Sequence, residues 1–215
     1  MTTAIIGVGN IGSALARHLV GGAEPVILAA KDLSRAQTLA SELGPLARAA
    51  SVEEAMAGAD VVVFAVWLDT TKELIAEHRA LLEDTVVVDP SNPIAFDESG
   101  QMVGTLPGGH SAGAIVAALL PASAHYVKAF GTLAADVLAS SANRAPLRVA
   151  LFYATDDDTA ASTVERLIRA AGFEPLKVGG LAAAARIEVP GGDLQGAVLD
   201  LDEARAAIAT DEVDT

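Results

Sequence analysis

Three glycines close to the N-terminus carry the clearest chemical signal in the chain. They belong to a G-x-G-x-x-G motif that follows a short apolar run at positions 4–6 and comprises Gly7, Val8, Gly9, Asn10, Ile11 and Gly12. Between a strand and a helix, the first glycine of this motif permits a sharp turn, the second admits a diphosphate, and the third allows close helix packing. The diphosphate then meets the N–H groups and the positive dipole end of the helix. The motif therefore predicts a dinucleotide-binding turn.

The residues after the second expected strand decide which dinucleotide is preferred. A chain that binds NAD places Asp or Glu about 20 residues past the glycines, where it binds the ribose 2′-hydroxyl. Here Ala30 is followed by Lys31 and Arg35, and their spacing of four at a helix start would let both cations contact a 2′-phosphate. Asp32 is an alternative ribose ligand, although Asp at this place is also a typical helix N-cap. The pattern favours NADP(H) over NAD.

Three later segments should reach the same site, because open parallel sheets bind ligands beyond the carboxyl ends of their strands. They follow the third, fourth and fifth major strands that the sequence predicts. Asn92 lies in a loop stiffened by Pro90 and Pro93, where it could orient an amide or carbonyl of a ligand or bond its own turn. Trp67 could pack over the dinucleotide or fill a gap at the sheet end. The residues of these segments expected at the cofactor are Ala65, Val66, Trp67, Asn92 and Pro93.

No titratable side chain stands out as a catalytic acid or base. His110 precedes an expected helix and could contact a phosphate or help to cap that helix, whereas we expect a structural role for His125 at a strand start. Lys128 could pair with an acidic group of a ligand or with Asp89 on the neighbouring strand. Cysteine is absent, so disulfides and thiolate sites are excluded, and we expect no metal site. We therefore assign no catalytic residue.

Composition limits the class of partner. The chain carries a formal net charge of −14 and 4% aromatic residues, so charge repulsion and the shortage of stacking rings argue against nucleic acid. Positions 101–127 hold no charged residue, but proline and glycine interrupt them, and the longest apolar helix there is far short of the roughly 20 residues that span a membrane. No signal peptide is recognised before the first strand. We expect a cytoplasmic protein without a membrane partner.

Strand-like and helix-like segments alternate along the chain, which indicates an α/β protein. Two strands consist almost entirely of valine, as expected when helices cover both faces of a sheet. A loop is expected from position 90 to 109. The expected later strands are 25–30, 61–66, 85–89, 125–130, 147–153 and 174–178, and the expected helices after the glycine turn are 34–43, 51–57, 70–82, 111–120 and 158–171.

These elements predict a Rossmann-type fold with a doubly wound, mostly parallel sheet. We expect residues 1–178 to form an NADP-binding Rossmann domain, with a core at 1–140 and a sheet extension at 141–178. Residues 179–215 are expected to form a small C-terminal extension that completes the acceptor cleft. Its last residues, 210–215, are an acidic tail.

The glycine turn and the segments 65–68, 89–94 and 128–132 give the chain a family resemblance. Together with the ending 180–188, they resemble the NADP oxidoreductases that depend on the deazaflavin coenzyme F-420. The resemblance implies hydride transfer between C4 of the nicotinamide and C5 of a deazaflavin, the small-molecule redox partner. It also implies that the N-terminal unit holds NADP(H), that the C-terminal part roofs the deazaflavin cleft, and that the protein is a homodimer.

The same resemblance implies which residues line the reaction cleft. Gly131 stands where relatives often carry Asn or His. The implied cleft residues are Asn92, Pro93, Phe130, Gly131 and Thr132.

Two other interpretations stay open. Reductases of small imines or carbonyl compounds begin with the same nucleotide-binding unit, but they continue into a long helical dimerisation domain. The 37 residues that follow Val178, at positions 179–215, are too few for such a domain. A module that binds NADP without turning it over is the other alternative, because no acid or base is evident.

Overall fold

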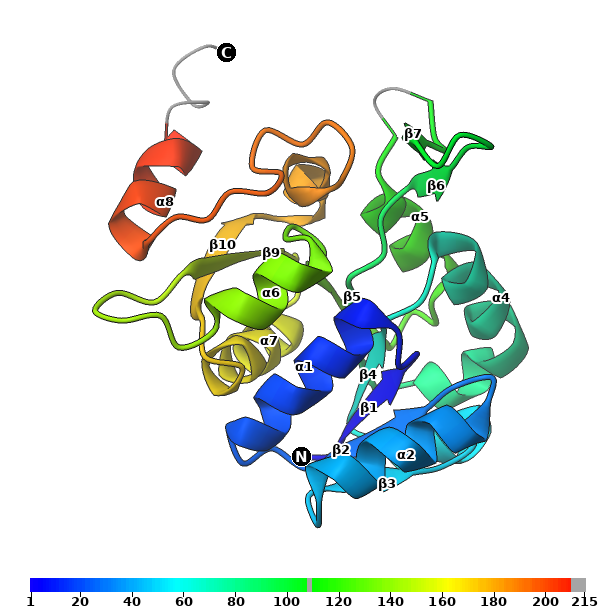
Figure 1. Cartoon of the computed structure of the whole chain (residues 1–215). Helices are drawn as coiled ribbons and strands as arrows, with labels where there is room; N and C mark the ends of the chain where they lie inside the picture. Colours follow the sequence, from blue (N-terminus) through cyan, green and yellow to red (C-terminus); the bar gives the residue numbers. More distant parts are fainter. Residues whose placement is uncertain (108–109, 210–215) are drawn as a thin grey trace.

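Eight strands form one sheet in the order β10-β9-β8-β5-β4-β1-β2-β3 in the computed structural model, which describes residues 1–107 and 110–209 (Figure 1). The strands from β3 to β8 in this order run parallel to one another. Chain order reverses between β1 and β4, which is the kind of switch point at which open α/β sheets bind ligands. The arrangement confirms the predicted Rossmann-type, mostly parallel sheet.

Most elements begin and end close to their predicted bounds. The strands of the large sheet are β1 (Thr3–Ile6), β2 (Val26–Ala29), β3 (Ala47–Ala49), β4 (Val61–Phe64), β5 (Val86–Asp89), β8 (His125–Ala129), β9 (Ala150–Ala154) and β10 (Glu174–Gly179). The α-helices are α1 (Asn10–Gly21), α2 (Leu33–Leu43), α3 (Val52–Ala57), α4 (Leu68–His78), α5 (Ala112–Leu119), α6 (Ala135–Ser141), α7 (Asp158–Ala170) and α8 (Leu201–Ala209). Short 3-10 helices are η1 (Arg79–Leu82) and η2 (Leu181–Ile187).

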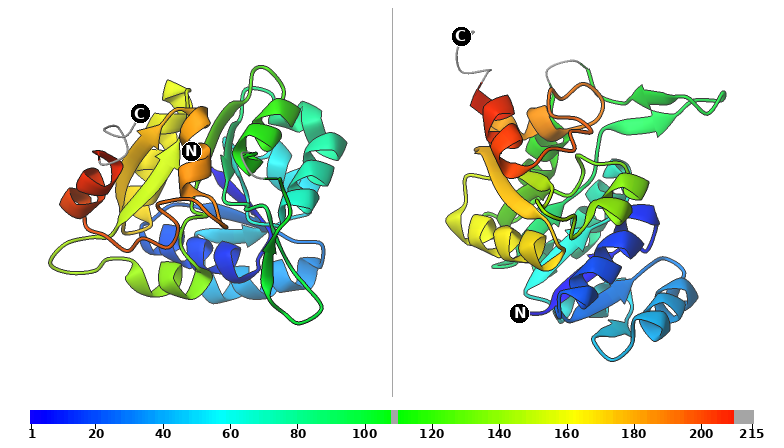
Figure 2. Two further views of the ribbon diagram at one scale, coloured as in Figure 1. Left: turned by 90° about the horizontal axis from the view of Figure 1, so that it is seen from above. Right: turned by 60° about the vertical axis from the view of Figure 1, so that its left-hand side comes forward.

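Helices cover both faces of the sheet (Figures 1 and 2). On one face α1, α2, α6 and α7 pack through a core that includes Leu15 and Leu167. On the other face α3, α4 and α5 pack through a core that includes Ile75 and Val116. The central strands β4 and β5 are buried along their whole length between these layers, which explains their valine runs.

Helix α7 shows how the sequence specifies these layers. Its buried residues recur every three or four positions, so that one face of the helix is apolar. Asp157 is its N-cap, and the Asp157 carboxylate accepts a hydrogen bond of 2.8 Å from the backbone N–H of Ala160. The other oxygen of this carboxylate lies 2.7 Å from Nδ1 of His125, in agreement with the structural role expected for this histidine.

The last two strands of the sheet break the parallel pattern. β9 is antiparallel to β8, and two residue pairs join them: Lys128 with Ala154 and Ala129 with Tyr153. Because β9 begins at Ala150, its first residues continue past the end of β8. With η2 and α8, β9 and β10 enclose a small core of their own. This C-terminal part therefore extends beyond the edge at which the parallel strands end (Figure 1).

The expected loop at 90–109 instead contains a hairpin of two short strands, β6 (Ile94–Phe96) and β7 (Met102–Gly104). Its turn is closed by the Asp97 carboxylate, which accepts hydrogen bonds from the N–H groups of Ser99 and Gln101. The hairpin projects from the body of the molecule (Figure 2). Helices α6 and α8 were not predicted either. No helix in the described part of the chain has the length and apolar character needed to cross a membrane.

Candidate functional site

A cavity of about 520 Å³ lies at the switch point between β1 and β4, where the parallel strands end. Its walls come from the loops after β1, β4, β5 and β8, from the hairpin, and from the C-terminal segment after η2. None of the described residues that line it is charged. The lining residues are Gly9, Asn10, Ile11, Ala65, Val66, Trp67, Pro90, Ser91, Asn92, Ile94, Phe96, Met102, Gly131, Thr132, Leu133, Ala134, Ala135, Val189, Gln195 and Gly196.

The glycine turn has the geometry that its motif predicts. Gly7 has a φ of +100°, and a Cβ there would lie 2.4 Å from the carbonyl oxygen of Ala65. A Cβ on Gly12 would lie 1.9 Å from the carbonyl oxygen of Gly7, so only glycine lets the helix pack this closely. A Cβ on Gly9 would meet no atom within 4 Å. Gly9 thus leaves open the space into which a diphosphate must fit.

The start of α1 faces this open space. Gly9 is the N-cap of α1 and supplies no side-chain hydrogen bond. Gly9, Asn10 and Ile11 all line the cavity. Because the first N–H groups of a helix have no partner within the helix, this start offers donors and a positive dipole end to an anion. The fold therefore fits a dinucleotide at the glycine end of the cavity.

The candidate residues for a 2′-phosphate lie outside the cavity lining, at the junction of β2 and α2. Lys31 and Arg35 are exposed there, next to the half-buried Ala30. Asp32 caps α2: its carboxylate accepts hydrogen bonds from the hydroxyl of Ser34 at 2.7 Å and from the Ser34 N–H at 3.0 Å. These two bonds lower the pKa of Asp32. The N-cap role therefore uses one oxygen, Oδ1, of the carboxylate that was the alternative ribose ligand.

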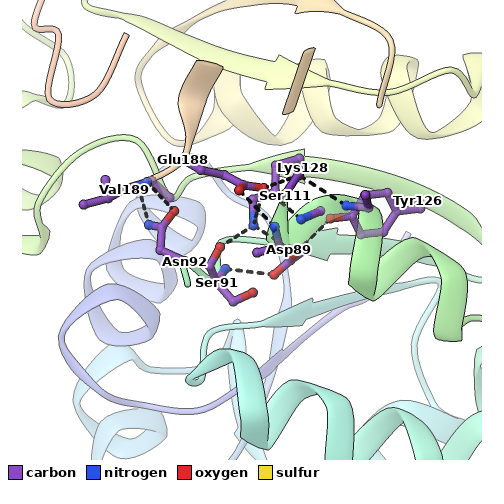
Figure 3. A network of polar contacts seen from close by, with 12 residues as sticks. Asp89, Ser91, Asn92, Ser111, Tyr126, Lys128, Glu188 and Val189 are labelled. Atoms are coloured by element: carbon purple, nitrogen blue, oxygen red, sulfur yellow. Dashed lines mark hydrogen bonds and ion pairs between the residues drawn. The ribbon is translucent and has the colours of Figure 1, made fainter. Parts of the chain in front are cut away.

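A buried ion pair lies next to Ser91, which belongs to the cavity wall (Figure 3). The ammonium group of Lys128 is 3.0 Å from the Asp89 carboxylate, and both side chains are almost completely buried. Lys128 also donates to the backbone carbonyl of Ser91, and the other Asp89 oxygen accepts from the Ser91 N–H at 2.8 Å. Lys128 thus pairs with Asp89 on the neighbouring strand, which was one of the two roles considered for it.

Tyr126 completes the buried pair. Its hydroxyl donates a hydrogen bond of 2.8 Å to the carboxylate of Asp89. Burial, together with the charge of this carboxylate and the hydrogen bond to it, raises the pKa of Tyr126 well above its ordinary range. Tyr126 therefore stays a neutral donor and does not serve as an acid or base near neutral pH.

Glu188 occupies the start of α5. Its carboxylate accepts hydrogen bonds from the N–H groups of Ala112 and Gly113, at 2.9 and 2.8 Å, and from the hydroxyl of Ser111 at 2.7 Å. It also lies 3.8 Å from the ammonium group of Lys128. Ser111 is the N-cap of α5, so the capping role considered for the exposed His110 falls to its neighbour. An internal carboxylate therefore fills this helix start.

Asn92 ties three segments together beside the cavity. Its amide group donates to the carbonyl of Gly131 at 2.7 Å, and its side-chain oxygen accepts from the N–H of Val189 at 2.9 Å. These long-range bonds occupy the amide instead of a bond to its own turn, which was one of the two roles considered for Asn92. A Cβ on Gly131 would lie 2.4 Å from the carbonyl oxygen of Pro90. Glycine is therefore required here by the close approach of the loops after β5 and β8.

The outer wall of the cavity is apolar and comes from α4 and the hairpin. The rings of Trp67 and Phe96 meet edge to face, with centroids 6.1 Å apart and planes at 88°. Both residues are more than half exposed, at 55% and 59%, and Met102 is 41% exposed. A flat ring could replace water on these side chains.

Two residues implied for the reaction cleft lie elsewhere. Phe130 has a φ of +65° and its side chain is completely buried in the core. Pro93 is buried as well and does not line the cavity. Conversely, Ser91, Phe96, Met102 and Val189 line the cavity but were not singled out. Apart from Ser91, whose loop was expected at the site, they belong to the hairpin and C-terminal segment, and their arrival depends on tertiary contacts.

Comparison with known proteins gives a family and a set of relatives. Residues 2–93 match the model of the family described as NADP oxidoreductase, coenzyme F-420-dependent. A hypothetical protein from Sinorhizobium meliloti of known structure is 32% identical, with a TM-score of 0.83 over 93% of this chain and 95% of that protein.

The chain belongs to the F-420-dependent NADP oxidoreductase family.

Other relatives widen the comparison of this oxidoreductase. An Arthrobacter protein described as an F-420-dependent NADP reductase shares the fold, at 21% identity and a TM-score of 0.73 over 85% of this chain and 86% of that protein. The metalloreductase STEAP3 of Rattus norvegicus is 30% identical over 184 residues, which are 86% of this chain. The chain spans 35% of the length of that curated relative. The match to the family model places the chain among the NADP-dependent oxidoreductases.

Proposed function

We propose that this oxidoreductase transfers a hydride between NADP(H) and the deazaflavin coenzyme F-420. The observation that carries the proposal is one uncharged cavity that runs from the glycine turn at Gly9 to the apolar wall formed by Trp67, Phe96 and Met102. One end suits a diphosphate and the other suits a flat ring. Such a cavity can hold the two reacting rings side by side.

The chain offers a distinct group for each part of NADP(H). The open space beside Gly9 and the uncapped start of α1 are where the diphosphate would bind. The exposed Lys31 and Arg35 at the start of α2 are where the 2′-phosphate would bind. When bound, NADPH supplies the carbon that carries the hydride. The residues from Ala65 to Trp67 would line the path of the nicotinamide half.

Hydride transfer asks for positioning and the exclusion of water, because both reacting carbons belong to the cofactors. The lining carries no charge among its described residues, and a ring bound against Trp67 and Phe96 would displace water from them. The nearest titratable groups, Asp89, Lys128 and Glu188, are buried and bonded to one another or to the backbone. The lack of an obvious acid or base in the lining is therefore consistent with this reaction.

The proposal is tested by mixing the protein with NADPH and oxidised F-420 and following the deazaflavin absorbance. We expect bleaching with F-420 and little turnover of a panel of imines and quinones. Turnover of small substrates alone would indicate a reductase of that class. Tight binding of NADPH without any turnover would indicate a nucleotide-binding module.

Cofactor preference is tested with the Lys31→Ala, Arg35→Ala double variant. Each cation should contribute about 1 kcal/mol to binding of the 2′-phosphate, so the Kd for NADPH should rise about 30-fold. The Kd for NADH should change less than about threefold. Arg205→Ala, which removes an exposed cation on α8, is the matched control. Equal losses for both cofactors would contradict the assignment of the 2′-phosphate site.

A further inference from the structure

Two hydroxyl groups of residues in the cavity wall have no hydrogen-bond partner among the described residues. They belong to Ser91, which is 4% exposed, and Thr132, which is 2% exposed. Both residues line the cavity, on the loops that follow β5 and β8. A buried hydroxyl without a partner is unfavourable and unusual in a folded protein. These two groups are therefore candidates for contact with a ligand.

The backbone of Ser91 is held firmly although its hydroxyl is unpartnered. Its N–H donates to Asp89 and its carbonyl accepts from the ammonium group of Lys128. The two partners form the buried ion pair described above, so Ser91 is bonded to a buried polar network (Figure 3). These bonds fix the backbone of Ser91, whereas its hydroxyl has no hydrogen-bond partner among the described residues.

The backbone of Thr132 is also held by a hydrogen bond. Its carbonyl accepts a hydrogen bond of 3.0 Å from the N–H of Gly196 in the C-terminal segment. The preceding residue, Gly131, is bonded to the amide of Asn92, which follows Ser91 directly. The loops that carry the two hydroxyls are therefore fastened to each other. Two residues with fixed backbones and unpartnered hydroxyls therefore line one cavity.

An unpartnered hydroxyl alone does not indicate a ligand, because Thr3 and Thr71 also have one. Neither of those residues lines the cavity. The combination of a fixed backbone, an unpartnered hydroxyl and a place in the cavity wall distinguishes Ser91 and Thr132. Thr71, on α4, is equally buried and provides a matched control.

We propose that the hydroxyls of Ser91 and Thr132 bind a carbonyl or carboxamide on the edge of a planar ring in this cavity. Such a group both accepts and, as an amide, donates hydrogen bonds, which two hydroxyls can match. The apolar wall of Trp67 and Phe96 would meet the ring face. The proposal rests on the proposed function, which supplies two sources of this chemistry: the carboxamide of the nicotinamide and the ring carbonyl of the acceptor.

The test uses Ser91→Ala, Thr132→Val and the double variant, with Thr71→Val as the control. The melting temperature of the ligand-free protein should stay within about 2 °C of wild type, because no hydrogen bond within the protein is lost. If the carboxamide is the ligand, the Kd for NADPH should rise about three- to tenfold in each variant. The Kd for 2′-phospho-ADP-ribose, which lacks the ring, should not change.

If the acceptor carbonyl is the ligand, the Kd for NADPH should be unchanged and the KM for F-420 should rise by the same factor. Either result supports the binding role of the two hydroxyls. The proposal is overturned if neither constant changes beyond twofold, or if the ligand-free variants melt more than about 5 °C below wild type. A wild-type protein that binds no NADPH overturns the proposed function as well, whereas normal binding with unaffected variants overturns this inference alone.

Discussion

Helices α1 and α5 both begin at the edge of the sheet where the parallel strands end, but their starts differ. At α5, the Glu188 carboxylate accepts the N–H groups of Ala112 and Gly113. At α1, the N-cap is Gly9, no side chain caps the helix, and the adjoining space is open. The same helix-end electrostatics is therefore satisfied within the protein at one place and left without a side-chain partner at the other.

The uncapped start of α1 is informative because the start of α5, at the same edge of the sheet, is capped by a carboxylate. Glu188 is 75 residues away from Gly113 in the sequence, and it reaches α5 only after the chain has passed through β9, β10 and η2. The fold thus supplies an anion for α5 from a distant segment. For α1 it instead supplies glycine at the position where any side chain would enter the cavity.

The largest effect is expected from opening the filled start with Glu188→Gln. The new side-chain amide would place an N–H donor against Lys128 and the helix N–H groups, which are donors themselves. The free energy of unfolding should therefore fall by about 3 kcal/mol. This corresponds to a melting temperature roughly 6–12 °C lower. The exposed Glu73→Gln on α4 is the control and should melt like wild type. A change in NADPH affinity without a loss of stability would contradict the structural role of Glu188.

The next effect is expected from filling the open start with Gly9→Asp. The backbone at Gly9, with φ −71° and ψ −164°, is that of an ordinary N-cap residue, so Asp should cap α1 and raise stability by roughly 0.5 kcal/mol. The same carboxylate would repel a diphosphate, and the Kd for NADPH should rise at least about 100-fold. Calorimetry and thermal denaturation measure the two quantities.

The variant Gly9→Ala separates the effect of charge from the effect of size at this position, and Gly21→Ala is its control. Gly9→Ala should weaken NADPH binding less than Gly9→Asp, because its Cβ intrudes without a charge. Gly21→Ala, near the other end of α1, also places a Cβ in open space and should leave binding unchanged. Equal NADPH affinity in wild type and Gly9→Asp would remove the distinction between the two helix starts.

The smallest effect concerns α7, whose start is capped by its own Asp157. Partial burial acts to raise the pKa of Asp157, but hydrogen bonds from the Ala160 N–H and from His125 outweigh it, so the pKa is lowered on folding. A lowered pKa means that the charge stabilises the fold above the unfolded value of about 3.9 and that this gain is lost as pH falls through the folded value.

The variant Asp157→Asn keeps the cap but removes the charge. At pH 7 the free energy of unfolding of this variant should be about 0.5 kcal/mol lower than that of wild type. The value is small because the side chains of Asp157 and His125 are each about one-third exposed. The difference should shrink as pH falls below the unfolded value of about 3.9. Melting curves of both proteins from pH 7 to pH 3 measure it, and a difference that grows at low pH would reverse the assigned sign.

The parallel strands and the glycine turn could be predicted from sequence because local patterns specify them. The valine runs of β4 and β5 and the spacing of Gly7, Gly9 and Gly12 each act over a few residues. The cap at Asp32 and the ion pair of Lys128 with Asp89 were also among the roles considered. All of these features depend on residues that are close in sequence or on neighbouring strands.

The hairpin and the C-terminal contacts could not be predicted in the same way. β6 and β7 have three residues each, too few to show a period, although the Asp97-to-Gln101 turn is a local signal that could have indicated them. The antiparallel direction of β9 depends on the path of the connection and not on its residues. Asn92 and Glu188 act through bonds across more than 70 positions, which spacing does not reveal.

The short pairing of β8 with β9 divides the sheet into a parallel part and a C-terminal part. Two residue pairs join β8 to β9, and the C-terminal part has a hydrophobic core of its own. The match to the family model ends at residue 93, just before the hairpin begins. We expect the hairpin and the C-terminal strands, which lie outside this match, to vary more among relatives than the glycine turn does. Divergence in this architecture is expected to alter what receives the electrons before it alters what donates them.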